Sequence, residues 1–186
     1  MKQVRGIEFH AGSREERLPD FAPDFPYIAS RAELDCYPER LVPWHWHRAV
    51  ELFYMESGAL EYSTPQGRAL FPAGSGGFVN TGVLHMTRPV GRAGENVQLV
   101  HLFDPSLIAG EPGSRIGQKY VLPLTAAPQV ELIALSPADP AQAALLADIR
   151  AAFSLSEAAD GCELRLRSAL SEIWLRLLEQ ARPQLE

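Results

Sequence analysis

The sequence predicts a mainly β protein of the α+β class, in which a barrel of short strands is followed by a pair of α-helices. Between residues 43 and 103, short apolar and aromatic runs alternate with turn residues, as in an all-β barrel or sandwich. Two stripes of apolar residues at helical spacing follow nearer the C-terminus. The 186 residues, 46% of them hydrophobic, are enough to bury one core. We therefore expect a barrel with an N-terminal arm over residues 1–135 and a helical pair over residues 136–186.

The N-terminal segment is the least periodic part of the chain. Residues 5–9 form a candidate short strand, and residues 12–25 are charged and contain prolines, which indicates a loop or an arm. The first long strand is expected over Phe25–Tyr37. Pro26 lies near its start, where a missing backbone N–H is tolerated.

The following strands are separated by short turns. Val50–Glu56 and Leu60–Ser63 predict a hairpin about Gly58, and Pro65–Gly67 marks the next turn. Further strands are expected over residues 68–71, 77–80, 85–88, 96–103 and 130–135. Residues 110–128, rich in glycine and proline, predict an irregular excursion over the barrel surface.

Two amphipathic helices are expected to end the chain. Asp139 has the side chain of an N-cap, and Pro140 suits the first helical position. The first apolar stripe ends near Phe153, and a loop is expected over residues 158–161. Pro183 is expected to end the second helix. The second stripe consists of Leu166, Leu170, Ile173, Trp174, Leu177, Leu178 and Ala181.

Composition excludes several functional classes for this chain. The net charge of −6 argues against direct binding of nucleic acid, because phosphate binding requires a basic surface. No run approaches the ~20 apolar residues of a membrane span, and the N-terminus leads into no apolar signal core, so we expect a cytoplasmic protein. Cys36 and Cys162 have neither metal-binding nor redox spacing, which favours two reduced thiols.

A cluster of histidines provides the candidate site. In an extended strand His45, His47 and Glu51 have equal parity and would project to one face, and His85 follows a glycine turn further on. Three imidazoles and one carboxylate suit a divalent transition metal such as Zn, Ni, Fe or Mn. The alternative is a partly polar pocket that binds an organic effector through hydrogen bonds to the same residues.

Other residues near the histidines suit a small organic ligand. Phe53 and Met55 share the inward parity of Glu51, and Trp44 lies where it could stack on a ligand at the barrel mouth. Arg88 is a candidate anion anchor. His101 lies in an apolar run and is also a candidate pocket residue. Nothing else indicates catalysis, because no nucleophile with an attendant base and no phosphate loop is present.

The histidine spacing resembles the cupin superfamily. The pattern His-x-His, three residues, Glu, six residues, Gly from His45 to Gly58 is similar to the first cupin motif. In the second motif the matching residues are Gly74 and His85, whereas Asn80 replaces the usual proline and Pro89 the usual asparagine. This resemblance implies a jelly-roll barrel, a double-stranded β-helix, and in related enzymes a metal used for dioxygen chemistry, isomerisation or decarboxylation.

A narrower resemblance covers nearly the whole chain. Several segments in order are similar to the N-terminal sensor domain of AraC-type bacterial transcription regulators, together with the closing amphipathic helix. These segments are Phe25–Ile28, the tryptophan-flanked histidine pair, Glu51–Tyr54, Leu84–His85 and His101–Pro105. The resemblance implies that residues 1–20 close over a ligand, for which a frayed terminus is the alternative.

The AraC resemblance also implies a homodimer formed by the C-terminal helices. We expect the interface over residues 162–181, through Leu166, Leu170, Ile173, Trp174, Leu177 and Leu178. Regulators of this type bind DNA through a helix-turn-helix region of about a hundred residues, which this chain lacks. We therefore expect an excised effector-binding and dimerisation domain that is not an enzyme. A stand-alone, metal-dependent cupin enzyme is the alternative.

Overall fold

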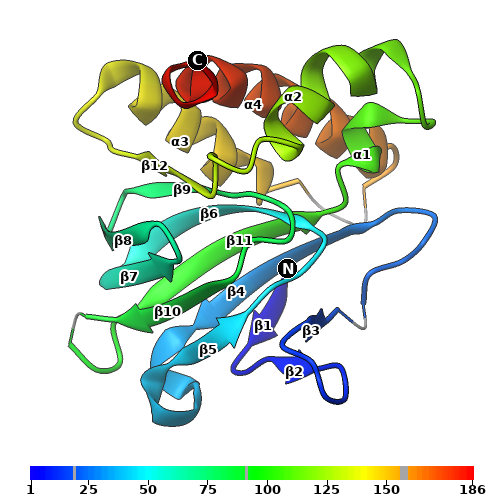
Figure 1. Ribbon diagram of the computed structural model, residues 1–186. Helices are drawn as coiled ribbons and strands as arrows, with labels where there is room; N and C mark the ends of the chain where they lie inside the picture. The colour runs from blue at the N-terminus through cyan, green and yellow to red at the C-terminus, as the bar shows by residue number, and fades with distance from the viewer. Residues whose placement is uncertain (19, 91, 156–158) are drawn as a thin grey trace.

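Two β-sheets face each other, and a layer of helices covers the outer face of the larger one (Figure 1). The computed structural model describes residues 1–18, 20–90, 92–155 and 159–186. The larger sheet contains, in spatial order, β1 (Lys2–Val4), β4 (Tyr27–Glu33), β11 (Val97–Phe103), β6 (Val50–Ser57), β9 (Gly76–Val79) and β12 (Leu132–Leu135). The smaller contains β5 (Val42–His45), β10 (His85–Pro89), β7 (Ala59–Thr64) and β8 (Gly67–Pro72). This double-sheet arrangement, characteristic of a jelly roll, confirms the predicted fold class.

Strand β6 shows how the chain separates an inner from an outer face. Phe53 and Met55 are fully buried in the cluster between the two sheets, whereas Val50 and Leu52 are buried in the cluster beneath the helices. Alternate residues of a strand point to opposite faces, so the same eight residues serve both cores. The inward parity predicted for Phe53 and Met55 is therefore the parity observed.

The hairpin predicted for β6 and β7 is wrong, because the chain changes sheets at Gly58. Strand β6 pairs with β11 and β9, whereas β7 pairs with β8 and β10. Gly58 has a φ of 72°, and a Cβ there would lie 2.3 Å from the side-chain oxygen of Asn96. The crossing thus requires glycine. The next turn was predicted correctly, since β7 and β8 pair as a hairpin from Thr64 to Gly67.

The helical layer consists mainly of α3 (Pro140–Ala152) and α4 (Cys162–Leu185). Asp139 caps α3 as predicted, its carboxylate accepting from the backbone N–H groups of Ala141 and Gln142. The loop expected at residues 158–161 lies partly outside the described residues, of which Gly161 adopts a left-handed conformation before α4. Helix α4 continues past Pro183 to Leu185, so proline does not end it. The missing N–H of Pro183 removes only one backbone hydrogen bond near the C-terminus of the helix.

The segment predicted to be irregular instead contains short helical turns. These turns are a π-helical turn η3 (Gly117–Val121) and α2 (Leu122–Thr125), and α1 (Ser106–Ala109) directly precedes the segment. Val121 and Leu124 are buried in the core shared with α4. The indole N–H of Trp174 donates to the carbonyl of Tyr120 at 2.8 Å. Packing against α4 therefore orders a segment that its glycines and prolines suggested would be a loop. Two 3₁₀ turns, η1 (Leu34–Cys36) and η2 (Pro38–Arg40), join β4 to β5.

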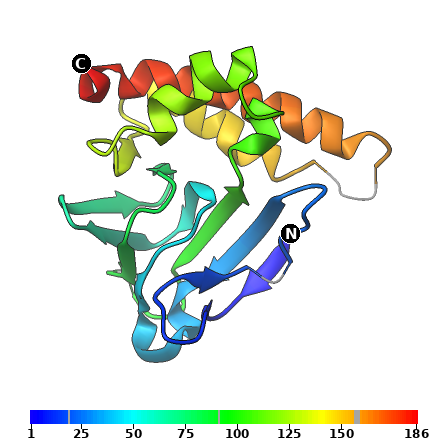
Figure 2. The ribbon, with the colours of Figure 1, turned by 45° about the vertical axis from the view of Figure 1, so that its right-hand side comes forward.

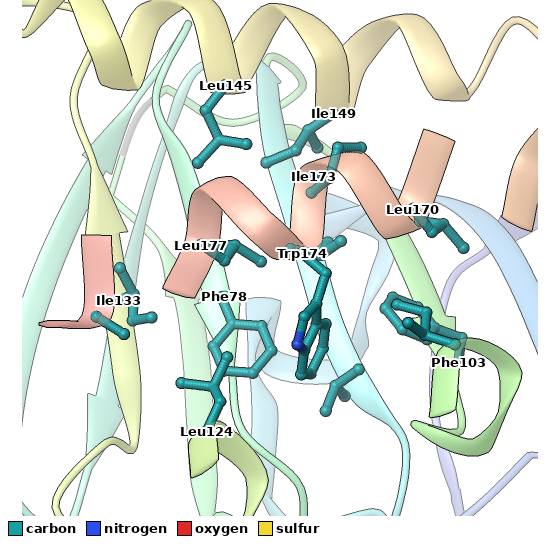
Figure 3. Packing of buried hydrophobic residues seen from close by; sticks show 14 of the residues in the cluster. Phe78, Phe103, Leu124, Ile133, Leu145, Ile149, Leu170, Ile173, Trp174 and Leu177 are labelled. Carbon is teal, nitrogen blue, oxygen red and sulfur yellow. The ribbon is translucent and has the colours of Figure 1, made fainter. Parts of the chain in front are cut away.

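The apolar stripe of α4 packs on the large sheet rather than on a second subunit. Figure 3 shows Trp174 between Phe78 and Phe103, with Leu170 and Leu177 beside it. Five of the six residues predicted for a dimer interface, namely Leu166, Leu170, Ile173, Trp174 and Leu177, are buried, and Leu178 is partly buried. The five buried residues are unavailable to a partner because they cover the outer face of the sheet.

The N-terminal arm, of which residues 1–18 and 20 are described, lies against the barrel on the side away from the helices (Figure 2). Strand β1 adds to the large sheet as a parallel partner of β4. Strands β2 (Glu8–Phe9) and β3 (Glu16–Arg17) form a separate two-stranded hairpin. The arm is therefore ordered against the barrel rather than frayed, and its closure over a ligand stays a prediction.

His101 joins the barrel to the helices. Its Nε2 lies 3.0 Å from the carbonyl oxygen of Ile149 in α3, and its Nδ1 lies 2.6 Å from the hydroxyl of Tyr27. Because a carbonyl only accepts, Nε2 carries the proton and Nδ1 accepts from the tyrosine. The ring also stacks on Phe153 at 3.5 Å. Burial lowers the pKa of His101 to about 4, so the imidazole is neutral in the folded chain.

We predict that His101 makes the fold less stable in acid. The unfolded chain binds a proton near pH 6.5 and the folded chain only near pH 4, so this contribution is complete above pH 6.5 and is lost as the pH falls towards 4. The slope is about 1.4 kcal/mol per pH unit. Urea titrations at pH 7, 6 and 5 should show a steeper loss for the unmodified chain than for His101→Gln. Equal slopes in the two proteins would contradict the assignment.

Candidate functional site

Three imidazoles meet in the space between the sheets. His45 ends β5 and is the register partner of His85 at the start of β10, while His47 lies in the segment that leads to β6. The ring centroids of His45 and His85 are 4.1 Å apart, and those of His47 and His85 are 5.2 Å apart. One ring nitrogen of each residue lies within 4.8 Å of the others. All three side chains are buried.

The route of the chain through the cluster differs from the single extended strand assumed from the sequence. Strand β5 ends at His45 in the small sheet, and β6 begins at Val50 in the large sheet. Residues 46–49 carry the chain across. His45 and Glu51 therefore reach the same interior from facing sheets, because the inner faces of both sheets bound one space.

Backbone carbonyls orient all three rings in the same way. Each Nδ1 lies 2.8 Å from a carbonyl oxygen two residues away in the chain, namely that of Pro43 for His45, Ala49 for His47 and Val83 for His85. A carbonyl can only accept, so each neutral ring carries its proton on Nδ1 and a lone pair on Nε2. Among the described residues, the buried Nε2 atoms of His47 and His85 have no hydrogen-bond partner. Nitrogen atoms that direct their lone pairs towards one point in this way can bind a metal ion.

Glu51 supplies a buried carboxylate beside the rings. Its Oε2 lies 3.5 Å from Nε2 of His47 and 3.7 Å from Nε2 of His85. Tyr62 donates its hydroxyl to Glu51, and the side-chain amide of Gln98 donates to Tyr62 at 2.6 Å. Burial alone would raise the pKa of Glu51, but its interactions with the two histidines hold it well below its usual range. The carboxylate is therefore charged.

The pKa values of His47 and His45 are shifted in opposite directions, and the charge of Glu51 contributes to the difference. Burial alone would lower the pKa of His47, yet the adjacent carboxylate raises it. Burial and the neighbouring rings instead hold the pKa of His45 well below its usual value. His45 is thus a neutral nitrogen donor, and His47 is the ring that most readily carries a proton.

The structure adds Glu16, a site residue that the sequence did not single out. It comes from β3 of the N-terminal arm, and its Oε2 lies 3.7 Å from Nε2 of His45. Burial, opposed by His47 and reinforced by Glu51, raises the pKa of Glu16 to about 7. Glu16 lies in a charged stretch with no motif, so only the position of the arm reveals it.

A cavity of about 280 Å³ opens beside the histidines, under the N-terminal arm. His45, His85 and Glu51 contribute to its wall. Its other polar lining includes Ser30, Tyr62, Thr87 and Gln98, and its apolar lining includes Ile28, Val100 and Leu102. The volume lies near the lower end of the ~300–1,000 Å³ typical of small-molecule pockets. The site therefore combines a candidate metal centre with space for a small ligand.

The five residues predicted to line a ligand pocket lie elsewhere, and among the described residues none of them borders this cavity. Phe53 stacks on Tyr62 at 4.5 Å in the core between the sheets, and Met55 is fully buried in the same cluster. Inward parity brings a side chain into the barrel, but here it fills the packed part rather than the open part.

The other three predicted pocket residues point away from the cavity for different reasons. Arg88 is exposed on β10 and pairs with Glu61 at 2.9 Å. His101 lies on the helix-facing side of β11. Trp44 is partly exposed and adjacent to inward-facing His45 on β5, so its side chain has the opposite parity.

Comparison with known proteins gives one match over most of the chain. The family described as the AraC-like ligand binding domain matches residues 27–174. No curated protein matches. None of the described helices is both long and apolar enough to cross a bilayer.

Solved structures of Bacillus subtilis oxalate decarboxylase resemble parts of the chain. One mutant is 19% identical with a TM-score of 0.31, over 34% of this chain and 18% of its own. Another is 17% identical with a TM-score of 0.31, over 39% and 23%. A third structure, from work on the Mn(II) centres of this enzyme, has 19% identity and a TM-score of 0.30, over 34% and 18%. The chain thus spans less than a quarter of these proteins.

Proposed function

Because this chain belongs to the family of AraC-like ligand binding domains, we propose that it is the effector-binding domain of an AraC-type transcription regulator in the cytoplasm. The observation that carries the proposal is the cavity between the sheets, which is covered by the N-terminal arm and lined by convergent polar groups. A small molecule would bind there. A DNA-binding region outside this chain would provide the output.

We propose that His45, His47 and His85, with Glu51, hold one divalent transition metal. The unpartnered Nε2 atoms of His47 and His85 support this, because buried polar atoms without partners are costly. A bound metal would act as a Lewis acid that attracts an oxygen or nitrogen donor of the effector. The donor set suits Zn, Ni, Fe or Mn.

Strand β11 offers a route from the cavity to the helices. Gln98, Val100 and Leu102 line the cavity, whereas His101 and Phe103 contact the helical layer from the opposite face of the same strand. An effector that favours one position of β11 would therefore also favour one packing of α3 and α4. In this proposal, that shift repositions the attached DNA-binding region.

A stand-alone metal-dependent cupin enzyme is the second candidate. The position of His45, His85 and Glu51 on the cavity wall favours it, because a substrate could reach a metal there. We place it second because the family match is to a ligand-binding domain.

We also propose that the domain forms a homodimer, through the outer face of α4 and with Leu178 as the one residue retained from the six first predicted. Leu164 is 72% exposed and Leu175 is 45% exposed. They are eleven residues apart, about three helical turns, and so lie on one side of the helix. Leu178, one turn further, is only partly buried. This apolar stripe is what a second α4 could cover.

The metal proposal predicts about one equivalent of Zn²⁺ per chain after reconstitution. His45→Ala or His47→Ala should abolish binding, whereas His10→Ala, at an exposed position of the arm, should not. Zn²⁺ at a hundred times its Kd should stabilise the unmodified chain by about 2.7 kcal/mol. Metal analysis and thermal unfolding measure both effects. An unmodified chain that binds no metal would refute the proposal.

The regulator proposal predicts that the native gene product is longer than this chain by about a hundred residues, enough for two helix-turn-helix units. Intact mass spectrometry of the protein from its own cell tests this. A mass equal to the 20.5 kDa of this chain would mean that no DNA-binding region is attached, and would favour the metal-dependent cupin enzyme.

The dimer proposal predicts that Leu175→Glu converts a dimer into a monomer at micromolar concentration. Leu70→Glu is the matched control, because Leu70 is 62% exposed but lies on β8 of the small sheet. Sedimentation equilibrium should give a dimer for the unmodified chain and for the control. A monomeric unmodified chain would contradict the proposal.

A further inference from the structure

The N-terminal arm brings a carboxylate to the histidine cluster from outside the barrel. Glu16 lies on the β2–β3 hairpin, which belongs to neither of the two sheets of the barrel. Its side chain is only 12% exposed, and its Oε2 lies 3.7 Å from Nε2 of His45. The arm therefore reaches the one described cluster of residues able to hold a metal.

Backbone contacts with Trp46 fix the position of Glu16. The N–H of Glu16 donates to the carbonyl of Trp46 at 2.9 Å, and the N–H of Trp46 donates to the carbonyl of Arg14 at 3.1 Å. Trp46 stands between His45 and His47 in the chain. The arm is thus paired with the segment that carries two of the three histidines.

Among the described residues, the other side-chain polar contacts between the β2–β3 hairpin and the barrel are weak. Arg14 donates to the carbonyl of Trp44 at 3.3 Å, and Arg48 lies 3.7 Å from Glu15, but both arginines are exposed. Exposed ion pairs contribute little to stability. The apolar side chains of the arm that pack on the barrel core are only partly buried. The hairpin can therefore separate from the barrel at low cost while β1 stays paired with β4, and a further contact at Glu16 would have a large influence on the position of the hairpin.

Charge balance indicates what that contact is. Closing the arm brings Glu16 towards Glu51, so a second carboxylate faces the same buried space beside the imidazoles, and each carboxylate that ionises there adds negative charge. Burying charge without compensation is costly. A divalent cation cancels this charge, and carboxylate oxygen with imidazole nitrogen is a donor set that Zn²⁺ accepts.

We infer that Glu16 is a metal ligand supplied by the arm, so that binding of the metal by the histidines closes the arm over the cavity. The inference rests on the metal site proposed above. On closing, a carboxylate oxygen of Glu16 donates a lone pair to the metal in place of water. Because the arm residues Val4, Ile7 and Leu18 line the cavity, metal occupancy then controls access of the effector.

Limited trypsin digestion tests this inference on the whole chain. Arg14 and Arg17 are exposed cleavage sites on either side of Glu16, and cutting there requires the arm to open. Cleavage of a segment that opens and closes rapidly follows the population of its open form. Saturating Zn²⁺ should therefore slow cleavage at these two sites by about tenfold or more in the unmodified chain, as expected for loss of a metal-site contact.

Glu16→Gln is the test variant, because its amide is a poor metal ligand of similar size. Glu8→Gln, on the partner strand of the same hairpin with a side chain 73% exposed, is the matched control. Zn²⁺ should leave the cleavage rate of Glu16→Gln unchanged and protect Glu8→Gln like the unmodified chain. By thermodynamic linkage, the factor by which Zn²⁺ slows cleavage of the unmodified chain should equal the factor by which Glu16→Gln raises the Kd for Zn²⁺. Calorimetric titration measures that factor.

The outcomes separate this inference from the metal site itself. If the unmodified chain and Glu16→Gln bind Zn²⁺ equally tightly, and Zn²⁺ does not protect the arm, the inference fails while the histidine site stands. If the unmodified chain binds no Zn²⁺, both proposals fail. Equal protection of the unmodified chain and Glu16→Gln would also overturn the inference, because closure would not depend on the carboxylate.

Discussion

The central strands of the large sheet, β11 and β6, are buried on both faces, and the rest of the structure depends on this constraint. In β11, alternate residues line the cavity or contact the helices, and β6 divides Phe53 from Leu52 in the same way. Because neither face is left to solvent, the helical layer is needed to cover the outer one. A change on the inner face therefore acts on strands that also support α3 and α4. This arrangement suits a domain that converts binding into a change of helix packing.

The histidine cluster depends on short-range backbone contacts as well as on the sheets. Each imidazole donates from Nδ1 to a carbonyl two residues away, which directs every Nε2 inwards. The turn before His85 is held by Asn80, whose side chain donates to the carbonyls of Leu124 and Val130. Asn80 replaces the proline of the usual cupin motif, and its hydrogen bonds show how a polar side chain secures this turn.

The arm links the accessible surface to the buried site. Its backbone bonds to Trp46 place Glu16 next to His45, and its residues form one wall of the cavity. The same segment therefore contributes to the electrostatics of the histidine cluster and to the entrance of the pocket. The cavity and the histidine cluster are consequently one structural unit rather than two independent features.

The sequence by itself determined the features that arise from local patterns. Alternation located the strands and the inward parity of Glu51 and Phe53, and side-chain chemistry identified Asp139 as the N-cap of α3. Spacing identified the histidines that the structure brings together. Only the tertiary structure decided that β6 and β7 belong to different sheets, that the α4 stripe covers the barrel, and that Glu16 reaches His45. These are contacts between distant segments. The periodicity of a strand or helix shows which face is apolar, but not which surface will cover it.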